Sequence, residues 1–414
     1  MLLSRLLRPL IRIGRLTVID ADGQSHVFGT DSEPSVTVRL HDRSLHWRLA
    51  LNPGLHAGEA YMAGTLTVED ATSYEFIELF ARNLECAGAV DLGGPVDILN
   101  RSLRRLKQFN PAPRARRNVA HHYDLSAELY DLFLDADRQY SCAYFTEPGQ
   151  DLETAQLRKK QHIAAKLHLE PGMRVLDIGC GWGGLGLYLA ERLGAEVTGI
   201  TLSTEQLALA NARAAAAGLE ASAQFHLRDY RHETGNFDRI VSVGMFEHVG
   251  VNHYGEFFRT VHDRLADDGV ALLHTIGRRD GPGSTNPWLQ KYIFPGGYSP
   301  SLSELSAAIE RSGLWINDVE VLRLHYAETL RHWRLRFEAN RAQVAALYDE
   351  RFCRMWEFYL ATSEVSFRHL DSVVFQLQLS KRRDAVPQTR NYQLDTERRL
   401  VEAERDDARP RLVG

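Results

Sequence analysis

The stretch Val175-Leu176-Asp177-Ile178-Gly179-Cys180-Gly181-Trp182-Gly183-Gly184 decides the fold of this chain of 414 residues. Its apolar first half predicts a buried strand, its glycines predict a tight turn, and residues 185–190 predict the start of a helix. The glycines lack a Cβ, so the backbone can turn sharply there and a ligand can approach closely. Residues 196–200 predict a second parallel strand, at roughly the spacing of a βαβ unit. The stretch therefore predicts a ligand-binding loop between two strands.

The D-x-G-x-G-x-G pattern from Asp177 to Gly183 resembles the cofactor loop of S-adenosylmethionine-dependent methyltransferases. The alternative is a nucleotide-binding or merely glycine-rich turn. Dinucleotide binders, however, carry G-x-G-x-x-G and place a pyrophosphate on the helix N-terminus. Strand, loop, helix and second strand in this order favour the methyltransferase interpretation.

Length and composition indicate an ordinary globular protein of two domains. No stretch approaches the roughly 18 apolar residues of a membrane span, and the arginines near the N-terminus do not fit a signal peptide. The four cysteines, at 86, 142, 180 and 353, include no C-x-x-C pair. We therefore expect no metal site, no disulfide framework and a reducing cytoplasm.

The net charge is only −5, but basic residues are clustered. Residues 1–19 carry four arginines and no acid. Residues 100–122 also lack acids and carry Arg101, Arg104, Arg105, Lys107, Arg114, Arg116 and Arg117. Such clusters attract anionic surfaces, either nucleic acid or lipid headgroups.

Residues 1–109 predict a small α+β domain. Asp22-Gly23 indicates a hairpin turn, residues 36–40 alternate like a half-buried strand, and 73–84 and 97–109 resemble helices. Residues 2–8 predict a short basic amphipathic helix limited by Pro9. Its leucines either lie in a membrane interface or pack on the domain that follows.

Residues 110–117, with two prolines and no periodicity, predict a linker. From 118 to 385 helices and strands alternate, which predicts an α/β, doubly wound, Rossmann-like sheet with its ligand at the carboxyl ends of the strands. A long helical stretch is expected at 331–361 and a charged, partly ordered tail at 386–414. The expected strands are 174–178, 196–200, 224–228, 237–243 and 269–276.

Polar residues follow several of these strands. Thr201 and Gln206 take the place where many methyltransferases hold the cofactor ribose with an acid, and Ser203 suits a helix N-cap with Gln206 completing a capping box. Asp229 is expected to accept a hydrogen bond from the adenine amine, or to lie in a surface loop. Glu247 follows the fourth strand. His274 lies in an apolar run, where a histidine is usually a core residue unless a partner such as Glu247 is near.

The chain also carries several longer motifs. They are Gly58–Gly64, His121–Ser126, Tyr140–Phe145, Gly199–Ser203, Phe246–Gly250, Ile293–Gly297 and His325–Leu330. On these motifs and the glycine loop, the chain resembles the cyclopropane-fatty-acyl-phospholipid synthases and the cyclopropane mycolic acid synthases over residues 118–385. The resemblance implies a class I methyltransferase fold and S-adenosylmethionine as co-substrate.

The resemblance also implies site residues. A bound bicarbonate would act as base, held by the side chains of Glu247, His274 and Tyr326 and by backbone amides near Cys142 and Val243. Cys142 is expected to serve through backbone and packing, because no covalent step is required. The implied cofactor contacts are Tyr140, Ser141, Asp177, Gly179, Gly181, Thr201, Leu202, Gln206, Asp229 and Tyr230.

The implied chemistry is demanding. An alkene is a weak nucleophile, methyl transfer to it makes a carbocation, and ring closure then needs a base in a site without water. Aromatic side chains would line the acyl channel or simply pack in the core. The candidates are Tyr144, Phe246, Trp288, Tyr292 and Phe294.

The expected partners are an unsaturated phospholipid and an anionic membrane surface, at the inner face of the plasma membrane, with a second copy of the chain forming a homodimer. Nucleic acid is not expected, because no N/D-P-P-Y/F motif is present. Three alternatives stay open: an enzyme that makes methyl-branched or methylene acyl chains, a small-molecule N-methyltransferase, and a membrane-binding protein that holds the cofactor without catalysis.

Overall fold

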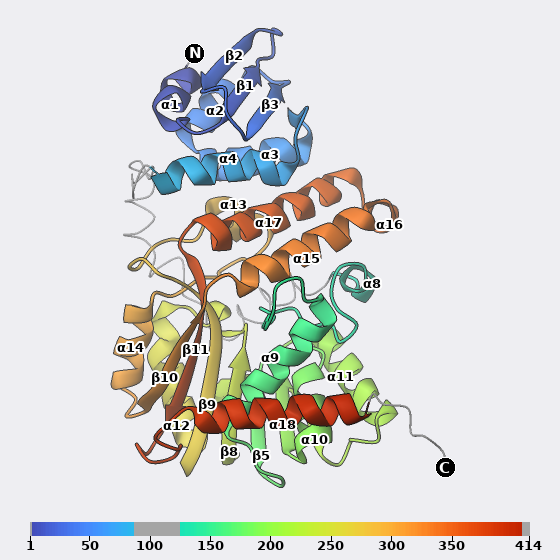
Figure 1. Ribbon diagram of the computed structural model, residues 1–414, viewed down its shortest axis with the longest axis vertical. Coiled ribbons are helices and arrows are strands. Elements are labelled where there is room, and N and C mark those ends of the chain that lie inside the picture. The colour runs from blue at the N-terminus through green and yellow to red at the C-terminus, as the bar shows by residue number, and fades with distance from the viewer. Residues whose placement is uncertain (1, 87–124, 408–414) are drawn as a thin grey trace.

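The computed structural model describes residues 2–86 and 125–407. It contains a small N-terminal domain, a layer of long helices and a large domain built on one sheet, stacked along the long axis of the molecule (Figure 1). The expected helix 97–109, the linker 110–117, the basic cluster 101–117 and the start of the motif at His121 lie outside the described residues.

The large domain is an α/β fold around a seven-stranded sheet of order β10-β11-β9-β8-β5-β6-β7. The strands β9, β8, β5, β6 and β7 are parallel, and β11 runs antiparallel to both of its neighbours. The bounds are β5 Arg174–Ile178, β6 Glu196–Thr201, β7 Ala223–Leu227, β8 Phe237–Val243, β9 Leu265–Arg278, β10 Trp315–Leu322 and β11 Ser372–Ser380. All five expected strands are confirmed, while β10 and β11 were not foreseen.

Apolar side chains on both faces of the sheet explain why helices cover both. Val175, Val197 and Val241 pack with α9, α10 and α11 on one face. Leu176 and Ile240 pack with α12 and α14 on the other, as expected of strands that alternate faces. The bounds are α9 Leu152–Leu167, α10 Gly184–Leu193, α11 Thr204–Ala216, α12 Tyr254–Arg264 and α14 Leu302–Glu310.

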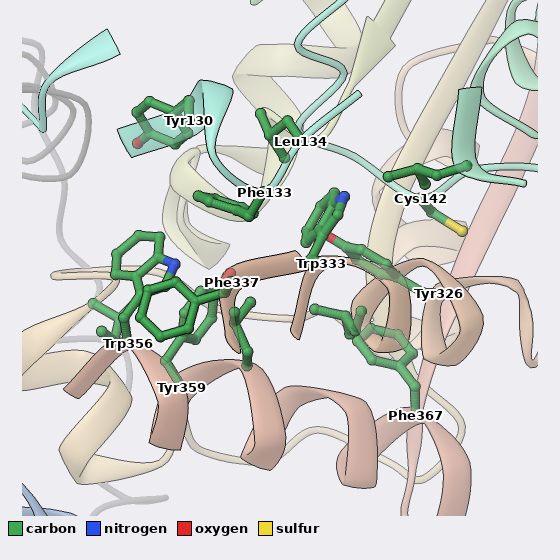
Figure 2. Packing of buried hydrophobic residues seen from close by; sticks show 14 of the residues in the cluster. Tyr130, Phe133, Leu134, Cys142, Tyr326, Trp333, Phe337, Trp356, Tyr359 and Phe367 are labelled. Carbon is green, nitrogen blue, oxygen red and sulfur yellow. The ribbon is translucent and has the colours of Figure 1, made fainter. Parts of the chain in front are cut away.

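The expected long helix is three helices: α15 His325–Ala339, α16 Arg341–Leu347 and α17 Glu350–His369. They pack over residues 125–145 through an aromatic cluster that Figure 2 shows, in which Phe133 lies against Tyr140, Trp333 and Trp356. We call this set the aromatic cluster; its labelled members are Tyr130, Phe133, Leu134, Cys142, Tyr326, Trp333, Phe337, Trp356, Tyr359 and Phe367. The short helices α8 Ala127–Asp131 and α13 Pro287–Tyr292 complete this layer.

The segment expected to be a charged tail contains a helix, α18 Asn391–Asp407, which crosses the sheet domain beside α9 (Figure 1). Leu400 is buried in the core beneath it. The buried His162 of α9 contacts Glu397 of α18 at 2.6 Å and Glu320 of β10 at 2.7 Å. Most side chains of this segment are charged and face water, but one face of α18 packs against the sheet domain.

Within residues 2–86, the N-terminal domain carries a four-stranded sheet of order β2-β1-β3-β4 and four helices. The predicted hairpin at Asp22-Gly23 is confirmed, since β1 and β2 pair antiparallel around it. Helix α1 buries Leu3 and Leu7 in the domain core, which favours packing over membrane insertion for these two leucines, while Leu6 is exposed. The bounds are α1 Leu2–Leu10, β1 Arg15–Ile19, β2 Ser25–Gly29, β3 Ser35–Leu40, α2 Leu45–Leu51, α3 Pro53–Ala63, β4 Leu66–Val68 and α4 Ser73–Cys86.

Helices α3 and α4 dock the N-terminal domain on α17 and α13 (Figure 1). The Tyr61 hydroxyl donates to Glu357 at 2.8 Å, and the Trp288 indole N–H contacts Met62 Sδ at 3.1 Å. Gly58 allows this approach, because a Cβ there would lie 2.5 Å from Trp288 Nε1. Among the described helices, none is long and apolar enough to cross a membrane.

Gly58→Ala is expected to lower the free energy of unfolding by about 1–3 kcal/mol, because the added methyl must displace a fully packed indole. Urea unfolding measures this change. Gly54→Ala in the same helix is the matched control, since its Cβ would meet nothing closer than 3.6 Å. Equal stability of the two variants would contradict tight packing between α3 and α13.

Candidate active site

A deep cleft opens at the carboxyl ends of the parallel strands, where a doubly wound sheet binds its ligand. Its walls include Asp177 at the end of β5, Thr201 at the end of β6, Asp229 after β7 and Val243 at the end of β8. The cleft holds about 1240 Å³ of empty space, counted to its open mouth. The cleft is lined by backbone at the glycine loop and by polar side chains at the strand ends, as a ligand with several polar groups requires.

The glycine loop shapes one wall of the cleft. Gly179 has φ of 84°, and a Cβ on it would lie 2.7 Å from Met245 Cβ. Gly181 has φ of 54°, and no heavy atom lies within 4 Å of the place its Cβ would take. The first glycine thus permits close packing, and the second leaves open space facing the cleft.

All ten residues expected to contact the cofactor line this cleft. They are Tyr140, Ser141, Asp177, Gly179, Gly181, Thr201, Leu202, Gln206, Asp229 and Tyr230. Of the five expected catalytic residues, Val243 lines it, while Cys142, Glu247, His274 and Tyr326 lie outside this lining. The structure brings the first set and Val243 together at one surface and places the other four residues beyond it.

Asp177 is a buried carboxyl group on the floor of the cleft. Its Oδ2 has no hydrogen-bond partner in the part of the chain that the structure describes. Burial raises the pKa of Asp177 to about 7, and the nearby Lys159 opposes that rise. A buried carboxyl oxygen without a partner fits a ligand donor such as an ammonium or hydroxyl group.

Thr201 and Gln206 form the side of the cleft at β6. The Thr201 hydroxyl donates to Gln206 Oε1 at 2.9 Å, and Ser203 caps α11 by accepting from the Gln206 amide at 3.3 Å. The N-cap is thus confirmed, but the expected capping box is not formed, because the Ser203 amide donates to Thr201 Oγ1 at 3.2 Å and not to Gln206. The Gln206 side chain pairs with Thr201, which leaves both polar groups at the cleft surface.

Asp229 is buried and already paired. Both of its carboxylate oxygens accept from the Arg231 guanidinium, at 2.9 and 2.6 Å. Burial alone would raise the pKa of Asp229, but these hydrogen bonds outweigh it and lower the pKa. Asp229 is therefore an anion held rigidly at the cleft, with lone pairs left for a donor.

The segment that carries Tyr140, Ser141 and Cys142 is held by α9. The Gln156 amide donates to the carbonyl oxygens of Gln139 and Ser141 at 3.1 and 3.0 Å. The Lys159 ammonium donates to Ser141 Oγ at 2.7 Å. Gln156 and Lys159 were not predicted as site residues. The sequence does hold a sign of their inward position, because they fall on the same helical face as the apolar Leu152 and Ile163.

Glu247 and His274 lie next to residues of the cleft, because Glu247 precedes His248 in the chain and His274 pairs with Val243 across β8 and β9. Glu247 Oε1 accepts from the Ile276 amide at 2.5 Å, two residues beyond His274 on β9. Its Oε2 has no partner within the described ranges, and burial raises its pKa to about 7. Burial holds the pKa of His274 well below its usual range, so the imidazole is neutral, and its Nδ1 accepts from Gln376 at 3.1 Å.

Cys142 and Tyr326 belong to the aromatic cluster and lie near one another in Figure 2. Burial raises the pKa of the Cys142 thiol, which therefore stays protonated, in keeping with a packing role. Two of the backbone amides beside the expected oxyanion donors already have partners. The Ala143 amide donates to Thr329 Oγ1, and the Gly244 amide next to Val243 donates to the His274 carbonyl.

The aromatic candidates for an acyl channel have different surroundings. Phe246 packs with Tyr254, Phe257 and Phe258 in the sheet core, so it is a core residue. Tyr144 is stacked between His162 and His325. Trp288 and Tyr292 lie at the N-terminal domain. Phe294 lies between His248, a cleft residue, and Tyr359. Of these five, Phe294 is the residue that links the cleft, through His248, with Tyr359 of the aromatic cluster.

The sheet order, the glycine loop and the cleft define a class I methyltransferase that uses S-adenosylmethionine. The site residues fit that co-substrate, since the cleft offers an unpaired buried carboxyl and open backbone at the glycines. The profile of the family described as Mycolic acid cyclopropane synthetase matches residues 111–377, and the chain belongs to this family.

Relatives agree with this assignment. The chain is 41% identical over 285 residues to the Cyclopropane-fatty-acyl-phospholipid synthase of Escherichia coli (strain K12), over 69% of this chain and 73% of that protein. It is 37% identical over 388 residues to Tuberculostearic acid methyltransferase UfaA1 of Mycobacterium tuberculosis, over 88% and 87%. The solved structure of mycolic acid cyclopropane synthase CmaA1 complexed with SAH and CTAB matches with a TM-score of 0.61 and 34% identity, over 66% and 99%.

Asp177→Asn is expected to change the pH dependence of stability. The folded protein retains a proton on Asp177 that the unfolded chain releases at its ordinary pKa of 3.8, so stability falls between about pH 4 and 7 as the proton is lost. Across this window, the free energy of unfolding should fall by roughly 3 kcal/mol less in the asparagine variant than in the wild type. Urea unfolding at a series of pH values measures the difference.

Asp137→Asn is the matched control. Burial raises the pKa of Asp137, but Lys160 and Arg213 outweigh it and lower the pKa, so this group titrates below the window. Its variant should keep the wild-type slope between pH 4 and 7. A parallel slope for Asp177→Asn and the wild type would show that Asp177 is ionised in the folded protein at low pH.

Proposed function

We propose that the protein transfers one carbon from S-adenosylmethionine to the cis double bond of an acyl chain in a membrane phospholipid, and that the product is a cyclopropane. The observation that carries this proposal is the combination of a cofactor cleft with two buried titratable side chains, Glu247 and His274, and an aromatic cluster. S-Adenosylmethionine, when bound, supplies an electrophilic methyl group.

The aromatic cluster suits the acyl chain and the cation formed on it. Tyr140, which lines the cleft, stacks on Trp333 at 5.1 Å, and Trp333 meets Tyr326 edge to face at 5.8 Å. These rings continue from the cleft without a charged group among the cluster's members. Ring faces attract a cation, and more strongly where water is absent.

Glu247 and His274 supply the proton chemistry. Both are buried. The pKa of Glu247, about 7, lets this group take up or release a proton near neutral pH, and the neutral His274 can donate a hydrogen bond. The unpartnered Glu247 Oε2 would accept the acidic proton of a bicarbonate, and donors from His274 and Tyr326 would suit its oxygens. On this proposal bicarbonate is the base that takes the proton from the new methyl group.

A second outcome is a methyl-branched acyl chain. The relative named Tuberculostearic acid methyltransferase UfaA1 spans more of this chain than the E. coli synthase does. Methyl transfer to the alkene is common to both outcomes, and only the place of proton loss differs. The cleft and the aromatic cluster support both, while Glu247 and His274 beside the cluster favour ring closure.

The deciding experiment is mass spectrometry of lipids after incubation of the protein with methyl-deuterated S-adenosylmethionine and cis-monounsaturated phospholipid vesicles. A product heavier by one CD2 unit that has lost its double bond supports ring closure. Retention of all three deuteriums supports the branched product. Absence of any lipid product, with cofactor bound, would overturn the lipid substrate and direct the search to amines.

Glu247→Gln is expected to remove most turnover while leaving the affinity for S-adenosylhomocysteine close to that of the wild type. The amide keeps the shape and can keep the bond from the Ile276 amide, but it cannot exchange a proton. Turnover is followed by release of S-adenosylhomocysteine, and affinity by calorimetry. A large loss of affinity would make Glu247 a cofactor ligand instead.

We further propose that the basic segments recruit an anionic bilayer on the cytoplasmic side and that the protein works as a homodimer. Replacing Arg114, Arg116 and Arg117 together by glutamine should weaken binding to anionic vesicles at low salt and leave cofactor affinity intact, because surface charge attraction is screened by salt. Vesicle sedimentation at two salt concentrations measures this. Unchanged sedimentation would show that these arginines do not bind the bilayer and that the segment only connects the two domains.

A further inference from the structure

Lys159 is a buried cation that the chemistry above does not use. It lies in the middle of α9, its side chain lines the cofactor cleft, and only 1% of its surface is exposed. Burying an ammonium group costs several kcal/mol unless it is paired. The site must therefore offer Lys159 a partner.

The hydrogen bonds of Lys159 leave that need unmet. An ammonium group has three donors, and in residues 2–86 and 125–407 Ser141 Oγ, at 2.7 Å, is its one hydrogen-bond acceptor. Over the same residues, no carboxylate lies within 4.0 Å of Lys159 Nζ. The other lysines of α9 differ, because Lys160 pairs with Asp137 at 2.7 Å and Lys166 pairs with Glu320.

The charge on Lys159 is set by its surroundings. Burial lowers its pKa to about 8, and the more distant Asp135 and Asp137 oppose that fall, so the group is mostly charged at neutral pH. Burial raises the pKa of Asp135, and Asp137 already pairs with Lys160 and Arg213. Among the described residues, neither carboxyl group forms an ion pair with Lys159.

We propose that Lys159, together with Ser141, binds the carboxylate of the methionine part of S-adenosylmethionine. Asp177, whose Oδ2 has no partner within the described part of the chain, would take the ammonium of the same group. A cation and an acid that line one cleft and do not pair with each other complement an α-amino acid zwitterion. The inference rests on the cleft being the cofactor site, but not on which lipid product forms.

A free bicarbonate is the other source of such an anion. Lys159 lines the cofactor cleft, whereas Glu247, His274 and Tyr326 lie outside its lining. Lys159 also holds the Ser141 side chain directly. These positions assign Lys159 to the cofactor carboxylate.

The test is calorimetric binding of two ligands, S-adenosylhomocysteine and its analogue that lacks the carboxyl group. Lys159→Met keeps the length and apolar stem and removes the charge. It should weaken binding of S-adenosylhomocysteine about 10- to 100-fold, the effect of a hydrogen bond to a charged group, and leave binding of the analogue near the wild-type value. Lys160→Met, which alters a neighbouring lysine outside the cleft lining, should bind both ligands normally.

The outcomes separate the explanations. Equal loss for both ligands would show that Lys159 only supports the loop and would overturn the proposal. Unchanged affinity for S-adenosylhomocysteine, with turnover that now needs more bicarbonate, would assign Lys159 to bicarbonate and also overturn it. If Lys159→Met does not fold, as judged by thermal unfolding, Lys159→Gln and Ser141→Ala take its place, and a selective loss for the carboxylate ligand supports the proposal. A cleft that binds neither ligand in the wild type would instead refute the cofactor assignment itself.

Discussion

Residues 139–146 belong to no helix or strand, so other elements must satisfy their backbone polar groups. The Gln156 amide of α9 donates to two carbonyl oxygens of the segment. On α15, Thr329 accepts from the Ala143 amide, and His325 Nδ1 accepts from the Phe145 amide at 3.0 Å. This segment is the wall between the cofactor cleft and the aromatic cluster. Its position is therefore fixed by two helices at once, and both halves of the site depend on that double anchorage.

The same site buries groups that water normally keeps charged. His274, Glu247 and Asp177 all have pKa values displaced toward their neutral forms by burial, and Lys159 is displaced in the same sense. Such displacement costs stability in the resting protein and is common where proton or charge chemistry takes place. The compensation comes from the aromatic and apolar packing around these groups.

Much of this arrangement could be predicted from the sequence. The glycine loop predicts the first strand of the sheet and the turn after it. Because the parallel strands all end at the same edge, Thr201, Asp229 and Val243 can then be placed at that edge from the sequence. The strand β10 escaped prediction because it lies at the sheet edge and buries only two of its eight residues, so its apolar alternation is weak. Lys159 escaped because charge in a helix usually means solvent, and only the fold shows that it faces inward.

Helix α18 gives the C-terminal part of the chain a role in completing the site. His162, Tyr144 and His325 form one stack of rings that joins α9, the wall segment and α15, and Glu397 of α18 contacts the first ring. During synthesis, α9 therefore gains this partner only once residues 391–407 have been made. Chains truncated before α18 would leave the buried His162 without Glu397 and would lack Leu400 in the core beside α9.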